Sequence, residues 1–289
     1  MSPGQYEYVA PASVEEAVQQ LQQQGARVLA GGTSLLRAVR QHRTTATRLV
    51  DLRRIGVLQQ IEHAGSLRIS AMATYDRIAA DAGVQAGYPA LYEAVVALTD
   101  PQVRNRATLG GSLASNDAAG DVPAAALALA ATVHVAGAAG KRTVPVDQFL
   151  VGPQQTGLAA GEILIAVEFP APAAASGSAY EKFRHPASGR ALCGVAVFVQ
   201  LTSAGKVQAC RVALTGAASR VTRLPQVEGA VTGRAPGPDT VAAAQRAAGQ
   251  GVSFVDDAGA TAEYRAHLAG VLVGRALARA LQRAGSPSH

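Results

Sequence analysis

The chain has 289 residues, 48% of them hydrophobic and 16% charged, which is typical of a folded protein with two or three domains and excludes a disordered class. The sequence contains no apolar run of the length that spans a membrane, and the polar start Met1–Tyr8 lacks an apolar targeting core, so we expect no integral membrane segment and a cytoplasmic location. The net charge is +6, but the arginines are scattered and aromatic residues make up only 4%, so we expect no nucleic-acid partner.

The first 55 residues predict a small α/β unit. Ser13 and Glu16 have the spacing of a capping box at the start of a helix, which Gly25 ends. The further elements expected here are a strand at 27–30, a helix at 34–41 and a strand at 48–52.

A second unit is expected over residues 56–172. Thr74 is an N-cap candidate, and Asp121 lies close to a helix start, where an acid followed by Pro123 is favoured. The expected elements are a strand at 67–71, helices at 74–82, 89–98 and 124–131, a hairpin with strands at 132–135 and 143–146, and a strand at 163–169.

A third unit is expected over residues 173–289, because the segment 170–177 is rich in proline and alanine and has the composition of a boundary. Its expected elements are strands at 192–201 and 207–215 and helices at 239–250 and 262–284. The whole chain is therefore predicted to be α+β, in three pieces without an internal repeat.

Two segments of small residues stand out from this background. The first, Ala30-Gly31-Gly32-Thr33-Ser34-Leu35, lies between a predicted strand and a predicted helix. The second runs from Thr108 to Asp121 and holds Gly110 and Gly111, followed by hydroxyl, amide and acidic side chains. Glycine allows a ligand to come close to the backbone, and N–H groups at a strand–turn–helix junction suit a phosphate. One such turn alone is equally consistent with an ordinary glycine turn before a helix; two of them favour a dinucleotide with a pyrophosphate.

The sequence has two cysteines, Cys193 and Cys210, which limits the metal sites that this chain can form. A [2Fe–2S] cluster needs about four cysteine ligands, and no Cys/His cluster suited to zinc is present in the sequence. Any metal redox chemistry connected with this chain is therefore expected on another polypeptide.

These motifs resemble a known family, the FAD-binding medium subunits of molybdenum hydroxylases of the carbon monoxide dehydrogenase and xanthine dehydrogenase type. The resemblance is carried by Ala30–Leu35, by Asp100-Pro-Gln-Val-Arg-Asn-Arg-Ala-Thr-Leu-Gly-Gly-Ser112, by Glu162-Ile-Leu164 and by the segment Tyr180–Ser188, and it covers essentially the whole chain. It implies a two-subdomain FAD-binding fold of the PCMH type, followed by a C-terminal α+β domain with an antiparallel sheet and helices.

The resemblance also implies where FAD would be held. The first glycine segment would wrap the pyrophosphate, and the second would form the other pyrophosphate wall and the ribityl wall. Asp117 and Asp121 would accept hydrogen bonds from FAD hydroxyls or brace the loop, Ala71 and Thr74 would lie near the adenosine, and Leu164 and Lys182 would lie at the isoalloxazine ring. The full candidate cofactor site is Ala30, Gly31, Gly32, Thr33, Ser34, Leu35, Ala71, Thr74, Thr108, Gly110, Gly111, Ser112, Asn116, Asp117, Asp121, Leu164, Lys182 and Arg190.

Several of these residues keep an ordinary structural alternative. Asp121 could be a helix cap, Leu164 a core residue and Lys182 a solvated charge. His185 could act as a base, although a loop or packing role is the more usual one for such a histidine. No catalytic residue and no metal ligand is assigned.

The sequence departs from the family pattern at two places. Arg190 stands where members often carry an aromatic residue near the flavin; an arginine there could stack on the ring, block the site or point away. Some proteins of the wider superfamily attach FAD to a histidine in the first loop, but this loop has Thr33 instead, so we expect non-covalent FAD.

The function implied by the resemblance is electron transfer within a molybdenum-containing hydroxylase or dehydrogenase complex. Electrons would pass from [2Fe–2S] clusters on a small partner subunit through FAD to an external acceptor, while substrate is oxidised at the molybdopterin of a large partner subunit, in a dimer of heterotrimers. The alternatives are a stand-alone FAD-dependent reductase of the same superfamily, akin to enolpyruvyl-glucosamine reductase, and a scaffold subunit without flavin.

Overall fold

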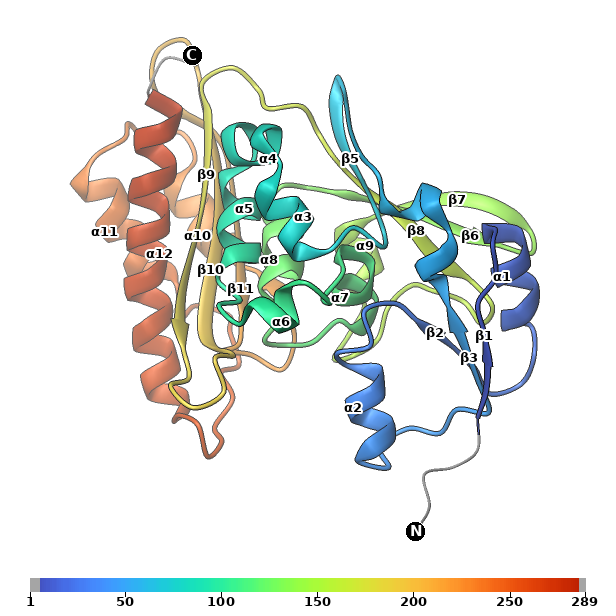
Figure 1. Ribbon diagram of the computed structural model, residues 1–289. Helices are drawn as coiled ribbons and strands as arrows, with labels where there is room; N and C mark the ends of the chain where they lie inside the picture. The colour runs from blue at the N-terminus through green and yellow to red at the C-terminus, as the bar shows by residue number, and fades with distance from the viewer. Residues whose placement is uncertain (1–5, 286–289) are drawn as a thin grey trace.

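The computed structural model describes residues 6–285, which form three sheets with helices between and around them (Figure 1). The fold is α+β, as predicted. Most of the N-terminal stretch Met1–Tyr8, on which the expectation of no targeting segment rests, lies outside the described residues. Within residues 6–285, no helix is both long enough and apolar enough to cross a membrane.

The first unit is a three-stranded parallel sheet in the order β1-β3-β2. The sequence pattern missed the short β1, which pairs beside β3 at the edge of this sheet. The elements of the unit are β1 (Glu7–Val9), α1 (Val14–Leu21), β2 (Ala26–Leu29), α2 (Leu35–Arg40) and β3 (Arg48–Asp51).

The predicted cap of α1 is present. The Ser13 hydroxyl accepts a hydrogen bond from the Glu16 N–H at 3.1 Å, and the Glu16 carboxylate accepts one from the Ala12 N–H at 2.9 Å. The buried residues Ala17 and Val18 of α1 then join a core cluster that also contains residues of the second unit. The first unit is therefore packed against the second.

The second unit is built on a five-stranded antiparallel sheet in the order β4-β5-β8-β6-β7. Its strands are β4 (Ile61–Ala64), β5 (Ser66–Ser70), β6 (Thr132–Gly137), β7 (Gly140–Pro145) and β8 (Ile163–Phe169). Two 3₁₀ turns, η1 (Leu52–Arg54) and η2 (Gly56–Gln59), connect the first unit with the second. The α-helices of the second unit are α3 (Tyr75–Ala80), α4 (Ala82–Gly87), α5 (Pro89–Val96), α6 (Pro101–Arg104), α7 (Leu109–Ser115), α8 (Asp121–Ala128) and α9 (Val146–Phe149).

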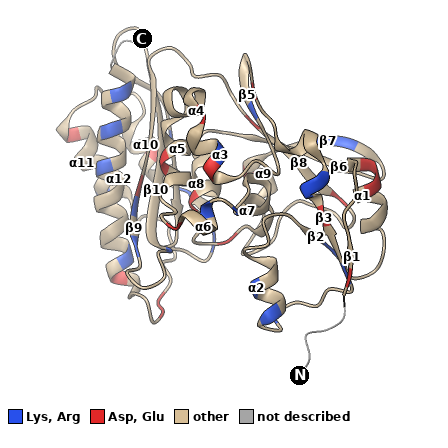
Figure 2. Ribbon diagram, viewed as in Figure 1, with Lys and Arg blue, Asp and Glu red and all other residues tan. Residues whose placement is uncertain are grey.

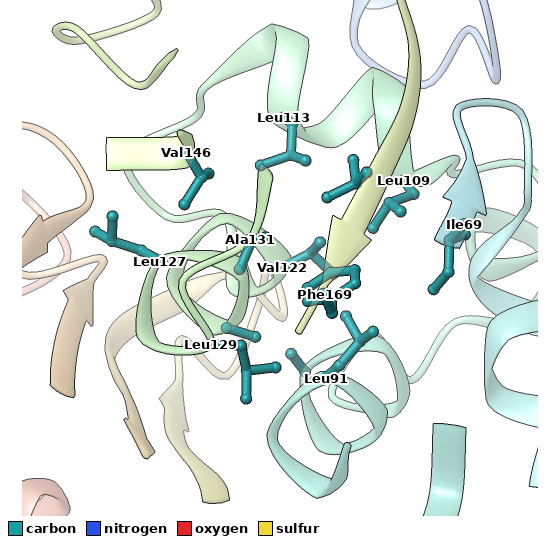
Figure 3. Close-up of a cluster of buried hydrophobic side chains, with 14 of the residues drawn as sticks. Ile69, Leu91, Leu109, Leu113, Val122, Leu127, Leu129, Ala131, Val146 and Phe169 are labelled. Carbon is teal, nitrogen blue, oxygen red and sulfur yellow. The ribbon is translucent and has the colours of Figure 1, made fainter. Parts of the chain in front are cut away.

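The core of this unit lies between the sheet and its helices (Figure 3). Leu109 and Leu113 of α7 and Leu91 of α5 are fully buried there beside Phe169 of β8. Since Leu109 and Leu113 are four residues apart, they lie on one face of α7 and hold that helix against the sheet. The segment that carries the second glycine pair is thus fixed in place by its own apolar residues.

The third unit is a four-stranded antiparallel sheet in the order β12-β11-β10-β9. Its core includes residues of the long helix α12, while α5 and α8 of the second unit contact the sheet as well (Figure 1). The elements are β9 (Ser176–Arg184), β10 (Ala191–Leu201), β11 (Val207–Thr215), β12 (Thr222–Arg223), α10 (Pro225–Val231), α11 (Pro238–Ala247) and α12 (Ala262–Gly285).

The structure corrects the sequence reading at two helices. The helix expected at 74–82 ends at Ala80 as α3, and the Asp81 carboxylate caps a separate helix, α4. Helix α8 begins at Asp121, in agreement with the helix start that the sequence placed close to this residue. Gly110 and Gly111 lie in the first turn of α7 and not in a turn before it, because the Thr108 hydroxyl caps this helix by accepting from the Gly111 N–H.

Candidate functional site

The two glycine segments, nearly 80 residues apart in the sequence, lie against one another. A Cβ atom added to Gly31 would lie 1.8 Å from the carbonyl oxygen of Arg106, and one added to Gly111 would lie 3.6 Å from Cβ of Ala30. Gly32 has a φ of +80°, a conformation that favours glycine. Glycine is therefore required here for the close approach of two backbones and for the turn of the chain.

The first segment has free hydrogen-bond donors. Within the part of the chain that the structure describes, the backbone N–H groups from Gly31 to Leu35 have no acceptor, and these residues are half-buried apart from the exposed Ser34. A run of such N–H groups beside glycines is suited to an anion with several oxygens.

The second segment differs from the expectation that its glycines would open further backbone donors. The Gly110 N–H donates to the Ala71 carbonyl at 2.9 Å, and the Gly111 N–H donates to the Thr108 hydroxyl at 3.2 Å. The Ser112 N–H is also used, in a 3.0 Å bond to the Thr108 carbonyl. Because these three donors are already engaged, residues 110–112 contribute a close-packed wall and offer no free backbone N–H group.

The predicted residues Ala71 and Thr74 lie at this wall. Ala71 is buried, and its Cβ would be 2.6 Å from a Cβ added to Gly110. Thr74 caps α3 and forms an isolated bridge with Thr108. Both therefore contact the second glycine segment.

A second group of predicted residues forms a buried acid–base cluster. The Lys182 ammonium lies 2.8 Å from Oδ2 of Asp121, and the Tyr180 hydroxyl donates to Oδ1 of the same carboxylate. The side chains of Lys182 and Asp121 are only 8% and 10% exposed. Lys182 is therefore a buried, paired charge and not a solvated one.

The titration of this cluster follows from its burial. Burial raises the pKa of Asp121, and the opposing effects of Lys182 and Tyr180 do not fully offset it. Burial, followed by the neighbouring Asp121 carboxylate, raises the pKa of Tyr180 well above its usual range. Tyr180 thus stays a neutral donor, and Asp121 keeps lone pairs that can accept from a further hydroxyl.

The sequence reasoning missed Tyr180. Tyr180 and Lys182 are two residues apart on β9, so their side chains point to the same face of the sheet. Space for the Tyr180 hydroxyl is left by Gly194 of β10, since a Cβ there would lie 2.4 Å from it. The alternation of residues around Lys182 was the signal that could have identified it.

Tyr75 is another residue of this region that the sequence reasoning missed. It is buried at the start of α3, near the Ser112 side chain and the Asp121 carboxylate. Burial raises the pKa of Tyr75 above its usual range, despite the opposing effect of Ser112. Tyr75 thus connects the second glycine segment with the cluster around Asp121.

Asp117 and Arg190 form a more exposed ion pair. The Arg190 guanidinium lies 2.6 Å from Oδ1 of Asp117, and the two side chains are 51% and 45% exposed. The same Asp117 oxygen accepts from the Ala119 N–H at 3.0 Å. Arg190 is therefore held toward the segment that follows the second glycine pair.

A cavity of about 490 Å³ opens beside this ion pair. It lies between the 118–119 segment and loops of the third unit, and its lining includes Ala118, Ala119, His185, Arg190 and Arg265. His185 has a loop contact, because its Nδ1 accepts from the Ser188 N–H at 3.3 Å.

Two further predicted residues are buried and have other contacts. Asn116 is 1% exposed and donates from its amide to the carbonyls of Gly152 and Gln155, while its Oδ1 is buried without a partner among the described residues. Leu164 is 4% exposed and belongs to the core cluster of the second unit. Asn116 thus joins the end of α7 to the segment 152–155, and Leu164 packs in the core.

Two protein families match this chain, and together they cover most of its length. Residues 4–172 match the family described as FAD binding domain in molybdopterin dehydrogenase, and residues 178–280 match CO dehydrogenase flavoprotein C-terminal domain. The carbon monoxide dehydrogenase medium chain of Hydrogenophaga pseudoflava is 37% identical over 98% of this chain and 99% of its own length. The nicotine 6-hydroxylase medium subunit of Paenarthrobacter nicotinovorans is 34% identical over 94% of this chain and 96% of its own.

A solved structure of the carbon monoxide dehydrogenase of Hydrogenophaga pseudoflava superposes with a TM-score of 0.93, over 98% of this chain and 99% of that one, at 37% identity.

Proposed function

Because the chain belongs to the family of FAD-binding medium subunits of molybdenum hydroxylases, we propose that it carries electrons from [2Fe–2S] clusters on a small partner subunit to an external acceptor. The large partner would hold the molybdopterin, and the complex would be a cytoplasmic dimer of heterotrimers. FAD, when bound, supplies chemistry in one- and two-electron steps, which the polypeptide has no group to perform.

The observation that carries this proposal is the contact between Gly31 and Arg106, which brings the two glycine segments together beside free N–H groups. Those N–H groups, with the hydroxyls of Thr33 and Ser34, fit the diphosphate of FAD. The wall formed by Thr108, Gly110 and Gly111 would close the other side.

The acid–base cluster fits the remaining part of the cofactor. Asp121 would accept from a hydroxyl of the ribityl chain while Tyr180 and Lys182 hold the carboxylate in place. Lys182 would also place a positive charge where reduction of the flavin develops a negative one.

Asp117 and Arg190 would lie at the entrance to the flavin, and Leu164 would support the ring from the core. Ala71 and Thr74 would lie on the adenosine side, and Asn116 would brace the loop.

The test is to purify the native complex and record its subunit composition and its visible spectrum. We expect two partner subunits and a flavin band at about 450 nm together with iron–sulfur absorption. We also expect release of the flavin by acid, because the first loop has Thr33 and no histidine. A yellow chain purified without partners would favour the stand-alone reductase. A complex without flavin would contradict the proposal and leave the scaffold role.

A further inference from the structure

Arg106 makes an unusual contact with the first glycine segment. Its Nε and Nη2 both donate to the carbonyl oxygen of Gly31, at 3.3 and 3.2 Å. Its own carbonyl lies against the same glycine, where a Cβ would come within 1.8 Å. Arg106, two residues before the second segment, therefore holds Gly31 through both its side chain and its backbone.

The orientation of one peptide unit depends on this contact. In a trans peptide the C=O of Gly31 and the N–H of Gly32 point in opposite directions. Because Arg106 holds the carbonyl on its own side, the Gly32 N–H faces the other side, where it has no acceptor within residues 6–285. Gly32 itself could turn this peptide over, since glycine adopts positive and negative φ about equally. The turned peptide would present an oxygen where an N–H now lies.

The charge of Arg106 is also uncompensated, in contrast to that of its neighbour. Arg104, two residues earlier, lies 3.2 Å from the Asp76 carboxylate. Arg106 is exposed and forms no salt bridge with an acid of the described chain. A guanidinium on a carbonyl polarises the peptide and makes its N–H a stronger donor. Both effects favour an anion at the Gly31–Gly32 turn.

We propose that Arg106 is a positioning residue that locks the Gly31–Gly32 peptide with its N–H toward the diphosphate of the cofactor. This inference rests on the proposed function and extends it to a residue outside the predicted site. Arg106 acts through Gly31 and Gly32, so it need not touch the cofactor itself.

The test measures the dissociation constant of FAD for the native complex after removal of its flavin, with wild type, Arg106→Ala, Arg106→Gln and Arg106→Lys. We expect Arg106→Ala to weaken FAD binding about tenfold or more, the range that loss of a charge-assisted hydrogen bond gives. Arg106→Lys, which keeps the charge and one donor at a time, should recover part of the loss, and Arg106→Gln less. ADP, which carries a diphosphate without a flavin, should lose affinity by a similar factor in each variant.

Arg104→Ala is the matched control, because it removes a neighbouring guanidinium whose contacts go to Asp76 and to the Leu98 carbonyl. Its FAD affinity should stay within about twofold of wild type. The unfolding temperature of each flavin-free complex separates loss of binding from loss of fold; should Arg106→Ala unfold early, Arg106→Gln provides the comparison.

Unchanged FAD and ADP affinity in a folded Arg106→Ala or Arg106→Gln complex would overturn the proposal. So would a loss that Arg106→Lys does not reduce at all. A wild-type complex that binds no FAD would instead contradict the proposed function, so the two failures are distinguishable.

Discussion

Some residues of this protein have contacts that their positions in the sequence do not predict. Lys182, for which a solvated charge was the structural alternative, is a buried partner of Asp121. Asp121 could have been a helix cap, yet it lies at the first position of α8 without a side-chain capping bond. Such pairings join residues about 60 positions apart, and no local pattern contains that information.

Arg190 is the residue whose effect on the cofactor is most open to measurement. Its charge is paired with Asp117, so Arg190→Tyr removes a positive charge and leaves a negative one unpaired. Both changes disfavour an anionic reduced flavin. We expect a lower midpoint potential, on the order of 30 mV, which corresponds to about tenfold in a two-electron equilibrium.

Redox titration of the purified complex measures this midpoint potential, and the FAD content is measured in parallel. Arg246→Tyr on the exposed side of α11 is the control, and its values should match wild type. If Arg190→Tyr changes neither the potential nor the FAD content, Arg190 has no influence on the flavin.

At the scale of elements, strands with long apolar or alternating runs could be predicted from the sequence, whereas strands without such runs could not. The strand expected at 163–169 is β8, and the strands expected at 192–201 and 207–215 are β10 and β11, because long apolar or alternating runs have a periodicity that can be recognised in the sequence. Strands β4 and β9 were missed: β4 is largely exposed and polar, and β9 begins inside the segment read as a boundary. Both are strands because of their neighbours in the sheet.

One acid of the second unit, Glu93, binds the long helix α12. The Glu93 carboxylate of α5 accepts from the Tyr180 N–H at 2.7 Å and from Arg283 at 2.7 Å, and it also pairs with Arg279. Figure 2 shows blue segments recurring along α12, which include these arginines. Glu93 thus joins α5, β9 and α12.

Glu93→Gln should therefore lower the free energy of unfolding by about 1–2 kcal/mol, a figure already reduced because both arginines are more than a third exposed. Urea unfolding of the full chain measures it. Glu263→Gln, in the exposed first turn of α12, is the control and should have little effect. Equal stability of Glu93→Gln and wild type would show that packing alone holds α12.

At the scale of the whole molecule, the three sequence units share their cores. Tyr180, Ala196 and Ala213 of the third unit lie in the core of the second, and Ala17 and Val18 of the first pack with Ile163 of β8. The division at 1–55, 56–172 and 173–289 therefore remains a prediction about units that contact one another extensively. Shared packing is what fixes the glycine segments and the Asp121 cluster relative to each other.

The sequence was sufficient to predict that the two glycine segments meet, because both have the small residues that close approach requires. It was not sufficient to predict that the Gly110 and Gly111 N–H groups are already bonded, since the Ala71 carbonyl that accepts from the Gly110 N–H comes from a different part of the chain. Arg106 was visible in the motif, but its contact with Gly31 depends on the folded distance between two loops.

The central claim is that the meeting of the two glycine segments creates the FAD site, and the FAD content of a complex carrying Gly31→Ala tests it most directly. The added methyl group would lie 1.8 Å from the Arg106 carbonyl, so the segments must separate. The control is Gly229→Ala on α10, where a Cβ meets nothing within 4 Å. We predict a folded complex that has lost most of its FAD, with normal FAD in the control; full FAD occupancy in Gly31→Ala would contradict the account.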